Sequence, residues 1–318
     1  MKVNELREIL KKYDEKDKDK IIVELYKFIP KAKKEERNID EYISDINKKV
    51  EKEVRNSNLP IDTLEKQIDY FCECAMSDLY ASPNRVIPKT ERSKWRFRVR
   101  SFYKQLNRFL PETEDGKKAT MLLKDLFSVL SYGTHYLIFP SWNTFGAIQV
   151  SQVDFFDCII GRVLINGVTR ENLNICVECL NVKYDPTIFH DSLFDVFCSF
   201  LHTTDTRKLA IELLEEKVEI LKEKYTKNNS YENKERLNSF VRCILNIYID
   251  LYEPQAGIKY FLKEYSEKDL EVKEYYLLDV LEGAELYTEW ITEYEKKVKK
   301  VDFRESLKEK YNKIKKQM

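Results

Sequence analysis

The sequence predicts an all-α protein, and three observations support this prediction. The 318 residues contain only seven glycines and eight prolines, far fewer turn-forming residues than a fold of many short strands needs. Apolar residues recur at spacings of three and four almost throughout the chain, which is typical of amphipathic helices. Charged residues make up 35% of the chain, enough to cover the outward faces of such helices. We expect an irregular α-solenoid of stacked antiparallel helical pairs without a fixed repeat.

The first sixty residues predict three helices. The first begins near Leu6, and Asp14 is suited to cap a second, whose inner face would carry Ile21, Ile22, Leu25, Tyr26 and Ile29 before Pro30 ends it. A third helix is expected over 38–56. The segment 56–60, which contains two asparagines and a proline, then breaks the chain.

Longer helices are expected after this break. A fourth spans about 61–80, a fifth about 89–110 between Pro88 and Pro111, and a sixth about 114–132. The remaining expected helices span 150–165, 169–182, 187–202, 204–226, 232–251, 254–265, 269–281, 282–299 and 302–316. The loop 227–230 is expected to separate a helical body, 1–226, from a C-terminal helical extension, 231–318.

Charge and cysteine usage indicate a cytosolic protein. The 55 basic and 55 acidic residues cancel, so only local charge blocks can attract nucleic acid or membrane. The N-terminal segment is charged and amphipathic and lacks the features of a secretory signal. Seven cysteines, an odd number scattered in apolar segments, are expected to be reduced core thiols. The uncharged stretch 126–153 is interrupted by Gly133, Pro140 and Gly146, so we expect a buried centre and no membrane span.

The segment Lys89–Arg108 is the most specific local signal, with eight basic residues and one acidic residue. On one continuous helix its basic residues at four-residue spacing would form a single stripe. This basic stripe consists of Arg92, Arg96, Arg100, Lys104 and Arg108. We expect it to bind a partner, with Trp95 or Phe97 as an aromatic anchor, because Arg and Trp dominate interface energetics.

Like charges four residues apart repel by about 0.2–0.5 kcal/mol per pair, so an acidic group should face the stripe. The favoured source is an acidic helix of the same chain, since 264–295 contains 11 acidic residues and two lysines, with Glu282, Glu285, Glu289 and Glu293 on one face. The alternatives are an acidic surface of a protein partner and the phosphates of a nucleic acid.

Histidines and cysteines supply weaker candidates. His135 and Trp142 lie in the uncharged connection 133–146, where a pocket could form together with His190 and Asp191; capping by Asp185 and hydrogen bonding in the core are the favoured roles there. Cys176 and Cys179 have the two-residue gap of zinc sites. Their segment has the pattern of a helix, so we expect buried core thiols and no metal.

Catalytic machinery of a familiar kind is missing from the sequence. No serine lies in a nucleophile elbow, and no glycine-rich loop is present to bind phosphates. We therefore expect no cofactor and favour a non-catalytic protein. An enzyme or metalloprotein centred on Cys176, Cys179, His190 and Asp191 is the remaining alternative of that class.

Several segments resemble an uncharacterised bacterial family of all-helical proteins. The opening segment Leu6–Tyr26, the basic segment Trp95–Arg108, Val153–Leu164 and Phe189–Leu193 are similar to successive parts of it. The resemblance covers about residues 3–203 and leaves 204–318 outside. It implies a helical array and no particular reaction, because the family has no established activity.

These observations favour a cytosolic helical scaffold that binds a protein partner through the basic stripe. The alternative is a nucleic-acid-binding protein that uses the stripe together with the basic C-terminal tail, 296–318, which has ten basic and three acidic residues. A solvated end-cap of the array is the favoured role for this tail by itself.

Overall fold

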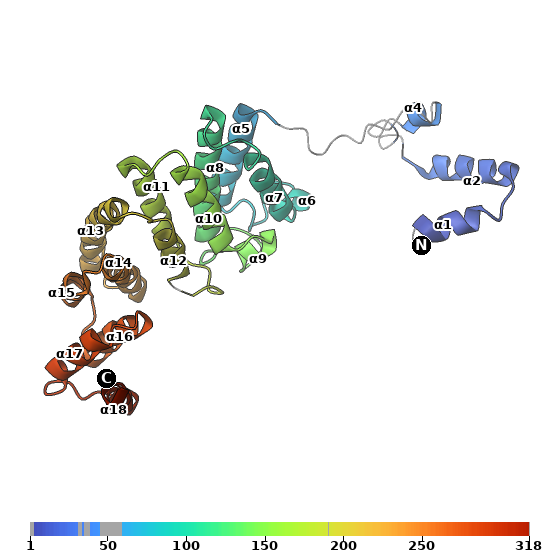
Figure 1. Ribbon diagram of the computed structural model, residues 1–318. Coiled ribbons are helices and arrows are strands. Elements are labelled where there is room, and N and C mark those ends of the chain that lie inside the picture. The colour runs from blue at the N-terminus through green and yellow to red at the C-terminus, as the bar shows by residue number, and fades with distance from the viewer. Residues whose placement is uncertain (1–2, 31–33, 35–38, 45–58, 190, 318) are drawn as a thin grey trace. The chain divides into compact units, whose positions relative to one another are not determined.

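The computed structural model describes residues 3–30, 34, 39–44, 59–189 and 191–317 (Figure 1). Over these residues the protein consists of helices and connecting loops, without a strand or sheet. The expected all-α class is therefore confirmed, while the solenoid-like stacking stays a prediction. The chain divides into two compact units, Met1–Leu59 and Pro60–Met318, and each is described by itself.

The first unit contains helices α1 (Val3–Leu10), α2 (Glu15–Phe28) and α4 (Ile39–Ser44). Asp14 caps α2 as expected, because its carboxylate accepts a hydrogen bond from the backbone N–H of Asp17 at 2.8 Å. The helix expected over 38–56 is present at α4, and 45–58 lie outside the described residues. The expected buried face of α2 is wrong, since none of its residues is buried.

The second unit is a succession of helices joined by short loops. They are α5 (Ile61–Met76), α6 (Lys89–Arg92), α7 (Trp95–Leu106), α8 (Glu114–Tyr132), α9 (Thr144–Ile148), α10 (Gln152–Leu164), α11 (Arg170–Leu180), α12 (Ser192–Ser199), α13 (Thr204–Lys227), α14 (Tyr231–Asp250), α15 (Pro254–Glu264), α16 (Leu270–Gly283), α17 (Tyr287–Lys297) and α18 (Glu305–Gln317). Most of them lie close to the expected ranges, because the apolar spacing and the capping residues fix helices locally.

Helices that pack together in this unit are mostly close along the chain. α8 contacts α5, α7 and α10, and α10 contacts α11 and α12, while α14 packs between α13 and α15 (Figure 1). α16, α17 and α18 follow as a second run of contacting helices. The loop 227–230, where the sequence predicts a boundary, joins two helices, α13 and α14, that pack against each other.

The uncharged stretch 126–153 contributes to the core as expected. Phe127 of α8 is fully buried, and its ring centroid lies 5.8 Å from that of Phe155 and 6.0 Å from those of Phe145 and Phe156. These aromatic contacts join α8, α9 and α10 around one apolar centre.

A buried arginine joins α10 to the beginning of α8. The Arg162 guanidinium donates hydrogen bonds to Thr120 Oγ1 at 3.0 Å and to the carbonyl oxygens of Phe109 at 3.0 Å and Gly116 at 3.2 Å. A Cβ atom at Gly116 would lie 1.7 Å from the carbonyl oxygen of Leu110. This close approach of two backbone segments therefore requires glycine.

The single helix expected over 89–110 is wrong, because the chain breaks it between α6 and α7. The Ser93 hydroxyl donates to the carbonyl oxygen of Thr90 at 3.3 Å, the group that would accept from Lys94 in a continuous α-helix. The Lys94 N–H bonds instead to Glu91, at 2.9 Å. The local geometry is the tighter 3₁₀ type.

The helix expected over 187–202 is also shorter, since α12 begins at Ser192. Asp185 does not cap it. Its Oδ1 accepts hydrogen bonds from the N–H of Thr187 at 2.9 Å and from the Thr187 hydroxyl at 2.7 Å, which forms a local turn. Sequence reasoning also missed the short helix α9, which Asn143 caps by accepting a hydrogen bond from the N–H of Gly146.

Candidate functional site

The break between α6 and α7 divides the predicted basic stripe. Arg92 belongs to α6, whereas Arg96, Arg100 and Lys104 belong to α7, and Arg108 follows the end of α7. A four-residue period places side chains in one row only while the helix continues. The prediction of one continuous five-residue stripe is therefore wrong, and each basic side chain has its own surroundings.

Two residues of the stripe form hydrogen bonds to backbone carbonyl oxygens of neighbouring segments. The Arg100 guanidinium donates to the carbonyl oxygens of Ala147 and Ile148, both at 2.8 Å. These carbonyls belong to the last turn of α9, where backbone acceptors lack helical partners, so Arg100 caps α9 from α7. Arg92 donates to the carbonyl oxygen of Ser82, in the loop before α6.

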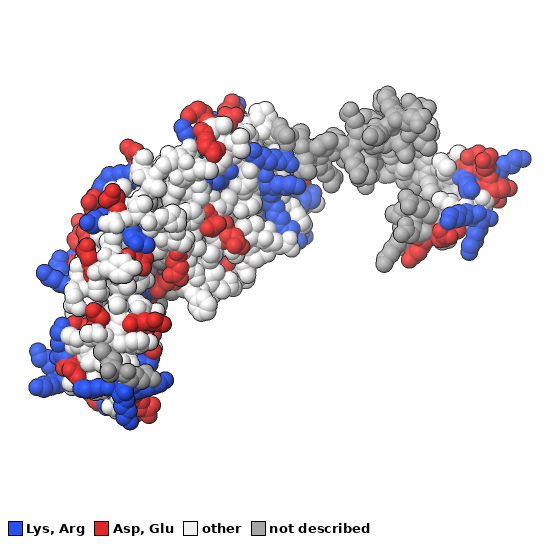
Figure 2. All heavy atoms as spheres, in the orientation of Figure 1, with Lys and Arg blue, Asp and Glu red and all other residues white. Residues whose placement is uncertain are grey.

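Other basic side chains of this region are exposed. Lys89, Arg96 and Lys104 are exposed, and within the described part of the chain no ion pair involves them. Figure 2 shows lysine and arginine side chains gathered over α6 and α7. We call Lys89, Arg96, Lys104 and the exposed ring of Phe97 the α6–α7 surface. Arg85, which sequence reasoning did not select, lies exposed in the loop before α6.

Trp95 and Phe97 have opposite environments. Trp95 is 2% exposed, and its ring stacks on that of Phe139 with centroids 4.1 Å apart. Trp95 is therefore a core residue, and its expected role as an anchor is wrong. Phe97 is 52% exposed, and the guanidinium carbons of Arg96 and Arg100 lie 4.9 and 5.5 Å from its ring centroid. These are cation–π distances.

The acidic region 264–295 faces the basic C-terminal tail. Five ion pairs connect them: Lys296–Glu293, Lys297–Glu274, Arg304–Glu271, Lys310–Glu282 and Lys315–Glu295. Glu274 and Glu293 are buried carboxylates, which need a cationic partner. Sequence reasoning favoured an acidic helix opposite the stripe, but among the described residues the ion pairs of this region join it to other lysines and arginines.

These contacts also shift the acid–base equilibria of the carboxylates. The hydrogen bonds from Arg304 hold the pKa of Glu271 below its ordinary value, and those from Lys315 and Tyr311 lower the pKa of Glu295. Hydrogen bonds to the charged form of a carboxylate favour that form. The five paired basic residues of the tail therefore serve internal contacts with α16 and α17.

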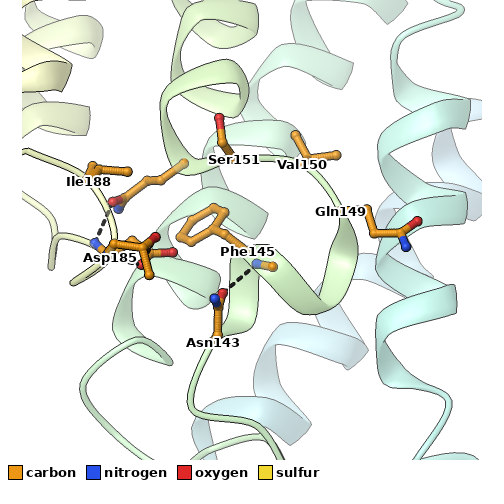
Figure 3. A pocket seen from close by; sticks show the side chains of 10 residues that line it. Asn143, Phe145, Gln149, Val150, Ser151, Asp185 and Ile188 are labelled. Carbon is orange, nitrogen blue, oxygen red and sulfur yellow. Dashed lines mark hydrogen bonds between the residues drawn. The ribbon is translucent and has the colours of Figure 1, made fainter.

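A cavity of about 200 Å³ lies beside α9 and the start of α10 (Figure 3). Its lining comes from Asn143–Gln152 and from the turn 185–188. Gln152 is buried and joins these segments, since its amide donates to the carbonyl oxygen of Lys183 at 2.8 Å and accepts from the N–H of Asp185 at 2.7 Å. Gln152 thus ties the turn 185–188 to the start of α10 through internal hydrogen bonds.

Three residues predicted for a pocket, His135, Trp142 and Asp191, do not line this cavity. His135 Nε2 lies 2.9 Å from the carbonyl oxygen of Tyr184, Trp142 is 73% exposed, and Asp191 pairs with Arg242. His190 lies outside the described residues. Part of the actual lining could have been located from the sequence. Ser151 and Asp154 have the spacing of a helix N-terminus, and the cavity lies at this start of α10.

The cysteines lie mostly inside the helical packing. Cys176 and Cys179 are buried, as expected for core thiols, and burial raises the pKa of Cys179 to about 12. Among the described residues no cluster of three or more metal-ligating side chains is present. Cys198 and Cys243, which sequence reasoning did not connect, bring their sulfur atoms into contact.

No helix in the described part of the chain is long and apolar enough to cross a bilayer. Comparison of the chain with known protein families, curated proteins and solved structures found no match.

Proposed function

We propose that this protein is a non-catalytic cytosolic scaffold whose α6–α7 surface binds an acidic segment of a protein partner. The observation that supports the proposal is the distribution of charge partners. The acidic region 264–295 is engaged by the C-terminal tail, while Lys89, Arg96 and Lys104 are exposed and form no ion pair among the described residues. Clustered exposed cations attract an acidic partner and steer its approach.

Phe97 gives this surface an exposed apolar group. The guanidinium carbons of Arg96 and Arg100 lie 4.9 and 5.5 Å from the centroid of this ring, and Arg100 is itself fixed by its hydrogen bonds to α9. A ring with a restricted position loses little conformational freedom on binding. We therefore expect the bound segment to combine carboxylates with an apolar or aromatic residue that packs on Phe97.

Nucleic acid is the second candidate, and the charge distribution makes it the weaker one. The sequence-based alternative needs two basic regions, the stripe and the tail. Five basic residues of the tail already pair with carboxylates of the acidic region 264–295, and each pair would have to open before phosphates could replace it. Binding to phosphates would also show the steep salt dependence of counterion release.

Fluorescence anisotropy with defined probes tests the proposal. The probe is a labelled peptide rich in Asp and Glu with one central aromatic residue, and single-stranded and duplex oligonucleotides serve for comparison. Arg96→Glu/Lys104→Glu replaces two attractions by two repulsions, each about 0.2–1 kcal/mol at exposed sites. We expect about tenfold weaker peptide binding, because 1.4 kcal/mol corresponds to a factor of about ten.

Lys208→Glu/Lys259→Glu is the matched control. Both lysines are exposed on other helices, α13 and α15, and the variant changes the net charge by the same amount. Peptide binding should stay within about twofold of wild type. Equal weakening in both variants, or tighter binding of an oligonucleotide than of the peptide, would contradict the proposed function.

A further inference from the structure

Two cysteines far apart in the sequence lie in contact. The Sγ atoms of Cys198, in α12, and Cys243, in α14, are 3.7 Å apart. The sulfur atoms of a disulfide are about 2.05 Å apart, so a bond between these two requires a small movement of the side chains. Cys176 and Cys179, by contrast, both lie on α11, where a bond between them would tie together no separate helices.

A second contact joins the same part of α14 to the start of α12. Arg242, which precedes Cys243, forms hydrogen bonds at 2.9 and 3.0 Å with the carboxylate of Asp191, the residue before α12. The Asp191–Arg242 ion pair fixes the start of α12, and the thiol contact lies in its last turn. The sulfur atoms are therefore held in position by the packing of two helices and do not meet by chance rotation of exposed side chains.

The two thiols differ in access to solvent. Cys198 is half-buried, whereas Cys243 is 1% exposed. An oxidant dissolved in water reaches Cys198 first, and Cys243 is then the neighbour that can react with the oxidised sulfur. A partly exposed cysteine next to a resolving cysteine is the arrangement found in redox-sensitive thiol pairs.

We propose that Cys198 and Cys243 form a disulfide when a peroxide oxidises the protein, and that this bond links α12 to α14. The Cys198 thiolate attacks one oxygen of the peroxide, the O–O bond breaks, and the products are a sulfenic acid on Cys198 and water or an alcohol. The Cys243 sulfur, after losing its proton, attacks Cys198 Sγ and displaces hydroxide, which leaves as water. Two thiols lose two electrons in total, and the peroxide gains them.

The environment of Cys243 slows the second step. Burial, together with the hydrogen bond to Cys198, raises the pKa of Cys243 well above its ordinary value. The thiolate is the reactive form, so the sulfenic acid on Cys198 should persist long enough to be trapped. Replacement of Cys243 should increase the trapped fraction because the resolving thiol is then missing.

Peptide mapping of the full chain tests this proposal. The folded protein is treated with hydrogen peroxide, its remaining thiols are blocked with N-ethylmaleimide under denaturing conditions, and it is digested without reductant. We expect two of the seven thiols to be lost, one cross-linked peptide pair containing Cys198 and Cys243, and recovery of both thiols on reduction. The oxidised protein should also unfold at a higher temperature than the reduced protein, since the bond closes a long loop.

Three variants make the test specific. Cys198→Ser should abolish the loss of two thiols, and Cys243→Ala should leave a sulfenic acid that reacts with dimedone. Cys158→Ser is the matched control, because Cys158 is also half-buried and its sulfur donates to Asn107 Oδ1 at 3.1 Å; this variant should still form the cross-link. Circular dichroism confirms that each variant is folded. Retention of all thiols in the wild type, a link to another cysteine, or a link only between chains would overturn the proposal.

Discussion

Asp191 and Arg242 form a two-point ion pair that joins the start of α12 to α14, with Nη2–Oδ1 and Nε–Oδ2 distances of 2.9 and 3.0 Å. The guanidinium is almost fully buried and also donates to the hydroxyl oxygens of Tyr265 and Ser239. Asp191→Ala would leave this buried charge without its carboxylate. We expect a loss of about 2 kcal/mol in the free energy of unfolding, measured by urea denaturation, because hydrogen bonds to charged groups contribute about 1.5–3 kcal/mol.

A double-mutant cycle separates the pair from other effects. Arg242→Met removes the cation and keeps an apolar side chain, and the double variant Asp191→Ala/Arg242→Met should lose less than the sum of the two single changes. Strict additivity would show that the two side chains do not interact.

Arg100 and Lys104 lie one turn apart on α7 and have different roles. Arg100→Ala removes two hydrogen bonds to the last turn of α9, so we expect about 1–3 kcal/mol of destabilisation and faster amide hydrogen exchange over 144–149. Lys104 is exposed, and Lys104→Ala should change stability by less than about 0.5 kcal/mol. Unchanged exchange in the Arg100 variant would contradict the capping role.

Substitutions of Trp95 and Phe97, two positions apart, should have different effects, one on stability and the other on peptide binding. Trp95→Ala empties a core position that stacks on Phe139 and should cost about 3–5 kcal/mol. Phe97→Ala should leave the melting temperature nearly unchanged, because the ring is largely exposed, and should weaken binding of the acidic aromatic peptide. If the Phe97 variant binds this peptide as tightly as wild type does, the aromatic contact is absent from the interface.

Acid should weaken the contacts of the C-terminal helices. The folded-state pKa of Glu271 is lowered by Arg304 from its ordinary value of 4.5. A lowered folded-state pKa gives stability that is fully present above pH 4.5 and is lost as the pH falls through the lowered value. Hydrogen exchange in α16–α18, compared between pH 6 and about pH 3, should show this loss after correction for intrinsic exchange rates.

Two substitutions in the C-terminal helices test whether the contact between Glu271 and Arg304 causes this pH dependence. Glu271→Gln should reduce the dependence of stability on pH in this window, since the titrating group is gone. Glu309→Gln, at an exposed position of α18, should keep the dependence of the wild type. An equal change in both variants would mean that the Arg304 contact does not cause the effect.

Local pattern was enough to predict most helices of the second unit. The apolar spacing places α8, α13 and α14 within a few residues of the expected ranges, because side chains three and four positions apart share a helix face whatever the rest of the chain does. The exceptions involve local hydrogen bonds of individual side chains. Ser93 ends α6 through its hydroxyl, and Asp185 stabilises a turn where the helix expected over 187–202 should have started.

The candidate site could be predicted only in part. Sequence reasoning identified the basic segment 89–108 correctly as a concentration of charge, but it offered Trp95 and Phe97 alike as the anchor. Helical spacing separates the two, because Trp95 shares an apolar face with Val99 and Phe102, whereas residues two positions apart lie on opposite sides of a helix. Only the tertiary structure shows that Phe139, which lies far along the chain, stacks on the buried Trp95 ring, while Phe97 stays exposed.

The sequence by itself determined the helical class of this protein, the approximate helix ranges and the separation of charge into basic and acidic blocks. These properties follow from contacts between residues a few positions apart. Tertiary structure alone decided which charges meet, pairing the acidic region 264–295 with the C-terminal tail, and which thiols touch, bringing Cys198 to Cys243 across 45 positions. Such pairs arise from the packing of separate helices, and no periodicity in the sequence encodes which residues will meet.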